Sequence, residues 1–173
     1  MWQRLPDTGG LKSMNKIEDA FKNKKAFIPF VTAGDPSLDV TRELILAMQE
    51  AGADLIEIGI PFSDPVAEGP VIQEADDRAL SAGVTTDKIF DMVDDIADKI
   101  HVPIVFMTYI NPIYVYGVEK FAKRAKACGA AGVIVPDVPF EEKEEIRGSF
   151  EAEGLVVISM VAPTSADRVR MIA

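Results

Sequence analysis

From residue 26 onward the chain repeats one unit, which consists of a short apolar strand, a turn and an amphipathic helix. The expected strands cover residues 27–33, 54–60, 102–109, 131–137 and 155–162. The expected helices cover residues 15–23, 38–51, 71–82, 87–100, 118–128 and 141–153, another begins after residue 165, and an aromatic loop runs to residue 116. Apolar strands that each lead into a helix predict a parallel sheet covered by helices.

Two architectures are compatible with this order: a doubly wound open sheet and a (β/α)8 TIM barrel. No glycine-rich nucleotide-binding loop follows the first strand, which disfavours the open sheet. Polar residues instead follow successive strands: Asp35, then Glu57 with Asp64 and Glu68, then Tyr109 and Asn111, then Asp137. Active sites of barrels are built from the carboxyl ends of several strands, so this distribution favours the barrel.

The number of units is smaller than a complete barrel requires. Five strand-helix units are present in the 173 residues, whereas a barrel has eight in about 250 residues. We therefore expect an α/β chain of the TIM-barrel family with only the first five β/α units, occupying residues 14–173. Residues 1–13 share no periodicity with the rest and are interpreted as a leader or an added tail.

One carboxylate lies in the middle of an apolar strand. Side chains alternate along a strand, so Ile56 and Ile58 share one face while Leu55, Glu57 and Gly59 share the other. A buried, unpaired carboxylate is unfavourable unless it is hydrogen-bonded or its pKa shifts. Glu57 is therefore either a functional acid or base or a charge on an edge strand that faces water.

Composition excludes several classes of function. The net charge of −10 with no basic stripe argues against nucleic-acid binding. One cysteine and one histidine provide neither an internal disulfide nor a Cys/His metal site. No apolar run reaches the roughly 18 residues of a membrane helix. We expect a cytoplasmic protein without a membrane segment.

Four motifs match a known family in order. They are FIPFVTAGDP at 27–36, EIGIPFSDPVAEGP at 57–70, MTYINP at 107–112 and VPDVP at 135–139. With these motifs the chain resembles the tryptophan synthase alpha subunit family from about residue 14 to its end.

The resemblance implies a carbon-carbon lyase in tryptophan biosynthesis. Its substrate is indole-3-glycerol phosphate, which a retro-aldol reaction splits into indole and glyceraldehyde 3-phosphate without a metal or an organic cofactor. Glu57 matches the essential acid/base glutamate, which moves a proton between the indole C3 and the side-chain hydroxyl. Glu68 matches the second catalytic carboxylate, which receives the indole N–H. The familiar pattern has Asp at this second position, so Glu68 adds a methylene.

The resemblance also assigns supporting residues. Phe30, Thr32 and Tyr109 match positions that line the indole pocket. Asp137 matches a carboxylate that helps to hold the catalytic loops. A final pair, Asp64 and Pro139, matches loop positions near the contact with the tryptophan synthase beta subunit, the partner in an alpha2-beta2 heterotetramer.

In the family, loops after the sixth to eighth strands bind the phosphate, and these loops have no counterpart in the 173 residues. A second reading is therefore a truncated, non-catalytic barrel portion that self-associates or docks on a partner. A third, another phosphate-handling barrel aldolase, is disfavoured because no lysine stands at a strand end for a Schiff base.

Overall fold

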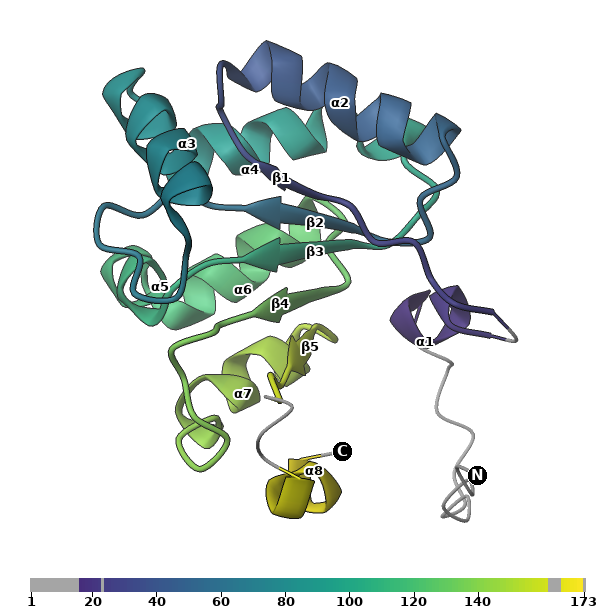
Figure 1. The fold of residues 1–173 in the computed structure, drawn as a ribbon, viewed down its shortest axis with the longest axis vertical. Helices are drawn as coiled ribbons and strands as arrows, with labels where there is room; N and C mark the ends of the chain where they lie inside the picture. The colour runs from purple at the N-terminus through teal and green to yellow at the C-terminus, as the bar shows by residue number, and fades with distance from the viewer. Residues whose placement is uncertain (1–15, 23, 162–165, 173) are drawn as a thin grey trace.

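The computed structural model describes residues 16–22, 24–161 and 166–172, and its core is one parallel sheet (Figure 1). The strands are β1 (Phe30–Thr32), β2 (Ile56–Gly59), β3 (Ile104–Met107), β4 (Gly132–Ile134) and β5 (Val156–Ile158). The helices are α1 (Lys16–Ala20), α2 (Leu38–Glu50), α3 (Pro70–Ser81), α4 (Thr86–Asp94), the 3-10 helix η1 (Ala97–Lys99), α5 (Ile110–Tyr116), α6 (Val118–Ala127), α7 (Glu144–Ala152) and α8 (Ala166–Ile172).

The order of the strands separates the two candidate architectures. In space the strands follow β1-β2-β3-β4-β5, and every neighbouring pair is parallel. A doubly wound sheet reverses its strand order at a switch point, whereas a barrel adds each new strand on the same side of the previous one. The described strands are therefore five successive strands of a TIM-barrel type of sheet, as predicted.

The two faces of the sheet have different coverings. On one face, Val31, Ile58, Phe106 and Val133 belong to the main core together with buried side chains of α2, α4, α6 and α7. On the other face, Leu55, Val105 and Ile134 form a smaller cluster with Ala20 of α1. Helix α1 lies by the ends at which the strands begin, opposite the loops that lead to α3 and α5 (Figure 1).

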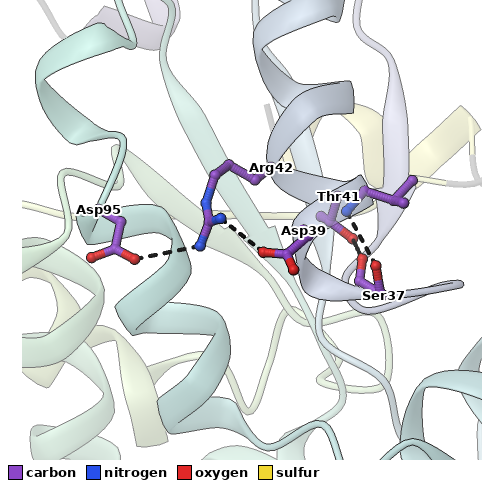
Figure 2. Close-up of polar contacts among 6 residues, drawn as sticks. Ser37, Asp39, Thr41, Arg42 and Asp95 are labelled. Atoms are coloured by element: carbon purple, nitrogen blue, oxygen red, sulfur yellow. Dashed lines mark hydrogen bonds and ion pairs between the residues drawn. The ribbon is translucent and has the colours of Figure 1, made fainter.

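Polar contacts fix the start of α2 and join it to the end of α4 (Figure 2). The Ser37 hydroxyl accepts an N–H from the first turn of α2, so Ser37 is the N-cap of this helix. The Thr41 hydroxyl donates to the Ser37 carbonyl at 3.0 Å. Arg42 donates to Asp39 at 2.8 Å and to Asp95 at 3.4 Å, which links two neighbouring helices on the outer layer.

Two segments differ from the sequence-based expectation. Residues 110–116, expected as a loop, form α5, because Pro112 stands in the first helical turn, where a missing N–H leaves no hydrogen bond unmade. The helix expected at 87–100 ends at Asp94 and is followed by η1. Acidic residues at its carboxyl end oppose the helix dipole, which disfavours continuation. The leader predicted at residues 1–13 lies outside the described residues.

The aromatic centre of the outer core gives a test of the fold. Phe121 of α6 is fully buried and its ring lies 5.1 Å from Phe90 and 5.9 Å from Phe150. We expect Phe121→Ala to lower the free energy of unfolding by about 3–5 kcal/mol, measured by urea denaturation. The matched control is Phe27→Ala, because the Phe27 ring is 54% exposed; its loss should be about 1 kcal/mol or less. Equal losses would contradict the described packing.

Candidate functional site

The predicted site residues lie at the carboxyl ends of the first strands. Phe30 of β1 is the register partner of Glu57 of β2, and Thr32 is the partner of Gly59 two residues on. Partners in a parallel ladder point to the same face, so Phe30 and Glu57 are side by side. A Cβ on Gly59 would lie 2.6 Å from the Phe30 ring. Any larger residue at position 59 would therefore clash with the Phe30 ring in its present position.

Glu57 stands on an interior strand, because β2 is hydrogen-bonded to β1 on one side and β3 on the other. The edge-strand reading of this residue is therefore wrong. Its side chain is half-buried, and burial raises the pKa of its carboxyl group above the usual value. No group in the described parts of the chain donates a hydrogen bond to it or pairs with its charge. Glu57 is thus a half-buried carboxyl group whose charge no described residue neutralises.

Thr32 contributes a second unpaired polar group on the same face of the sheet. It is 5% exposed, and its hydroxyl has no hydrogen-bond partner among the described residues. Buried hydroxyls are normally hydrogen-bonded. A buried hydroxyl without a partner beside the site is consistent with the predicted place in a binding pocket.

Tyr109 holds the loop that carries Glu68. The Tyr109 side chain is buried, and its hydroxyl accepts the Ala67 N–H at 2.8 Å. The same hydroxyl lies 3.4 Å from Oε1 of Glu68, to which it donates a weak hydrogen bond. Burial, followed by the negative charge of Glu68, raises the pKa of Tyr109. The Tyr109 hydroxyl therefore holds the carboxyl-terminal part of the loop between β2 and α3, next to Glu68.

Asp137 connects the fourth unit to the third. Its carboxylate accepts the Ile110 N–H at 3.0 Å and 3.3 Å, at the start of α5 and one residue after Tyr109. This contact is of the kind that the predicted supporting role requires. Asp64 and Pro139 are both exposed on loops at the same rim, and Asp64 accepts the Ser63 hydroxyl at 2.6 Å.

Another ion pair ties the first loop to α3. Arg78 donates to both carboxylate oxygens of Asp35 at 2.8 Å. This bidentate pair holds the pKa of Asp35 below its usual range. The loops after β1 and β2, which flank the site, are therefore joined through α3.

The sequence-based reading missed Asp76 of α3. Asp76 is 6% exposed, although it carries a carboxyl group. With Glu68 and Tyr109 it lines a cavity of about 10 Å³ between the loop and the strand ends. Burial raises its pKa to about 6, and the charge of Glu68 adds to the rise. The available signal was its spacing, since it occupies a position in the buried stripe of α3 with Ala75 and Ala79.

The described residues give no sign of a reactive cysteine, a metal site or a membrane-spanning helix. Cys128 is buried, and burial raises the pKa of its thiol to about 11, as expected for a packing residue. Among residues 16–22, 24–161 and 166–172, no cluster of three or more His, Cys, Asp or Glu side chains is arranged to hold a metal ion. Within the same ranges every helix is too short or too polar to cross a bilayer.

Asp76 makes stability depend on pH in a definite direction. The folded protein keeps its proton up to about pH 6, whereas the unfolded chain releases it near 3.8. The stability from this group is therefore full below the lower pKa and is lost as pH rises through the upper one. We expect the free energy of unfolding of Asp76→Asn, measured by urea denaturation, to exceed that of the wild type by about 2–3 kcal/mol above pH 7 and to equal it at pH 3. A difference that does not vary with pH would contradict this assignment.

Comparison with known proteins identifies the family. The model of the family "Tryptophan synthase alpha chain" matches residues 17–173. The tryptophan synthase alpha chain of Petrotoga mobilis is 48% identical over 161 residues, which are 92% of this chain and 62% of that relative. That of Halalkalibacterium halodurans is 48% identical over 162 residues, 92% of this chain and 61% of the relative. The chain thus spans about three fifths of the length of the curated relatives it matches.

Solved structures agree with this match. Tryptophan synthase subunit alpha from Legionella pneumophila superposes with a TM-score of 0.86 at 40% identity, covering 92% of this chain and 64% of that one. The tryptophan synthase a2b2 complex from Pyrococcus furiosus contains a chain that superposes with a TM-score of 0.80 at 41% identity, covering 85% of this chain and 63% of its own. The arrangement of the strands, the four motifs and these matches lead to one conclusion: the chain belongs to the tryptophan synthase alpha chain family.

Proposed function

We propose that the protein to which this chain belongs is a carbon-carbon lyase that cleaves indole-3-glycerol phosphate into indole and glyceraldehyde 3-phosphate. The observation that carries the proposal is Glu57, a half-buried carboxyl group with a raised pKa and no partner in the described residues, on an interior strand. Family membership supports the assignment of the reaction. A general acid is most effective when its pKa approaches the working pH, and burial shifts Glu57 in that direction.

Each proton in the reaction has a place in the proposed site. Protonated Glu57 donates to C3 of the indole and forms the indolenine. The resulting carboxylate then removes the proton of the side-chain hydroxyl. The bond between C3 and the side chain breaks, its electrons restore the aromatic indole, and the hydroxyl carbon becomes the aldehyde of glyceraldehyde 3-phosphate. Glu57 ends the cycle with the proton it began with, so no metal or cofactor is required.

The neighbouring residues bind and orient the indole. Glu68 accepts the indole N–H, which becomes more acidic as C3 is protonated, and Tyr109 keeps this carboxylate at the rim. The rings of Phe30 and Tyr109 pack against the indole, and the unpaired Thr32 hydroxyl is available to the substrate. Asp137 supports the loops through Ile110. In the proposal, the phosphate is bound by the part of the family barrel that lies outside the matched three fifths.

The proposal includes a tryptophan synthase beta subunit as partner. A Pyrococcus furiosus structure in the same family is described as an a2b2 complex. Asp64 and Pro139 are exposed at the rim where the site opens, which suits a contact that passes indole to a second subunit.

A second candidate function is a non-catalytic barrel portion that self-associates or docks on a partner. The observation that favours it is the sheet edge, because among the described strands β5 pairs only with β4 and β1 only with β2. Unpaired strand edges promote association. This candidate predicts a dimer or larger species in sedimentation and no indole release under any condition.

The first experiment measures indole release from indole-3-glycerol phosphate, with and without a tryptophan synthase beta subunit. We expect Glu57→Gln to lower kcat by about 10²–10⁴-fold, because glutamine cannot transfer the proton. The control is Glu43→Gln on the exposed surface of α2, which should change nothing. Absence of turnover by the wild type under both conditions would contradict the proposal for this chain and favour the second candidate.

A second experiment tests the loop that carries Glu68. Tyr109→Phe removes the hydroxyl that holds Ala67 and Glu68, and we expect kcat to fall by about tenfold because the carboxylate loses its position. Tyr114→Phe is the matched control, since Tyr114 is exposed and bonds Glu145 instead. The loop assignment is wrong if Tyr109→Phe and Tyr114→Phe have the same kcat.

A further inference from the structure

Gln73 of α3 contacts the residue that carries the second proposed carboxylate. Its side-chain nitrogen, Nε2, donates a hydrogen bond to the main-chain carbonyl of Glu68 at 2.9 Å. This distance is that of an ordinary N–H···O hydrogen bond. Glu68 lies near the end of the loop between β2 and α3, residues 60–69, called the Glu68 loop below. Gln73 therefore reaches back past the start of its own helix and holds the loop that precedes it.

The direction of this hydrogen bond distinguishes it from helix capping. The groups that lack partners at the start of a helix are N–H donors, and a capping side chain accepts a hydrogen bond from them. In a capping box, a Glu or Gln of the first turn likewise accepts the N–H of the N-cap residue. The N-cap of α3 is Gly69, and no side chain caps it. Gln73 instead donates to a carbonyl that lies before the helix, so its contact orders the loop.

The main chain around Glu68 is held by side chains from two different elements. The Tyr109 hydroxyl, from the segment after β3, accepts the Ala67 N–H at 2.8 Å. Gln73, from α3, binds the Glu68 carbonyl. The Glu68 carboxylate has a weaker contact of its own, the 3.4 Å hydrogen bond from the Tyr109 hydroxyl. The place of the carboxylate therefore depends mainly on how its main chain is held.

Helix α3 is itself fixed to the rest of the fold, so it can serve as a support for the loop. Ala75 and Ala79 bury one side of the helix. Near its carboxyl end, Arg78 donates to both carboxylate oxygens of Asp35 in the loop after β1, each at 2.8 Å. Bidentate pairs of this kind are among the stronger and more directional polar contacts. Gln73 thus connects the Glu68 loop to an element that is attached at a second point.

We propose that Gln73 is a positioning residue, which acts on Glu68 through its main-chain carbonyl and, with Tyr109, determines where the Glu68 carboxylate stands. Glu68 lines the same small cavity as Phe30 and Tyr109, two of the residues expected around the indole. Gln73 does not touch the substrate in this proposal. The catalytic part rests on the proposed lyase function. The structural part concerns the contact between Gln73 and Glu68 and is measured without substrate.

The structural test is the carbon-13 shift of the Glu68 carbonyl, measured by NMR in the wild type, Gln73→Met, Gln73→Glu and Glu74→Gln. Methionine and glutamate keep the length of the side chain and the helix propensity, but neither provides the N–H donor. Glu74→Gln is the matched control, because Glu74 is the next residue of α3 and its side chain is 73% exposed.

We expect the Glu68 carbonyl signal to move to higher field in both Gln73 variants, because the carbonyl loses its donor, and to stay in place in Glu74→Gln. The Val105 carbonyl in β3 reports any general change and should not move. An unchanged Glu68 signal in the two Gln73 variants would overturn the proposal, as would an equal shift in Glu74→Gln.

Indole release tests whether the contact serves catalysis. Gln73→Met should lower kcat by about three- to tenfold, the effect of one hydrogen bond, with little change in KM, because a displaced Glu68 is missed most in the transition state. Glu74→Gln should equal the wild type. A change in KM alone would contradict the positioning role.

A double-mutant cycle shows whether Gln73 acts through Glu68. In a Glu68→Ala background there is no carboxylate to position, so Gln73→Met should cause no further loss of kcat. Losses that multiply in the double variant would overturn the proposal. If the wild type releases no indole, the lyase function fails for this chain, while the Glu68 carbonyl shift still decides whether Gln73 holds the loop.

Discussion

The register of β1, β2 and β3 decides which face of the sheet each side chain of the site occupies. Phe30, Glu57 and Val105 are aligned across the three strands, and Ile56 and Ile58 point to the opposite, helix-covered face. A shift of β2 by one residue would exchange these faces and bury the Glu57 carboxylate among apolar helices. The fully buried isoleucines of β2 therefore keep the carboxyl group off the helix-covered face, where it stays half-buried.

Hydrogen bonds from side chains hold the loops that follow these strands. Two polar contacts cross from one β/α unit to another: Tyr109 with Ala67 and Glu68, and Asp137 with Ile110. Each contact fixes loop main chain with a side chain that is buried or half-buried. Loops at the carboxyl ends of barrel strands carry function because a rigid scaffold positions them. Here the scaffold reaches the loops through the Asp137 carboxylate and the Tyr109 phenol.

The sequence was sufficient for the features that depend on local patterns. Apolar runs located all five strands, although the hydrogen-bonded segments are shorter than those runs. Alternation placed Glu57 opposite the isoleucine stripe, and the motif at 57–70 led to the family. The contact of Tyr109 with Ala67 could not be predicted, because its partners are more than 40 residues apart in the chain. Asp76 was missed because a polar residue in a helical stripe resembles a surface residue until the loop that covers it is known.

The proposed chemistry requires Glu57 to be a half-buried carboxyl group that no cation neutralises. The most direct measurement is its pKa from carbon-13 NMR of the side-chain carboxyl, assigned by the loss of its signal in Glu57→Gln. We expect a pKa above the ordinary value of 4.5, because burial penalises the charged form without compensation from a partner. A pKa at or below 4.5 would mean that water or a cation stabilises the carboxylate, and Glu57 would then not be the proposed acid.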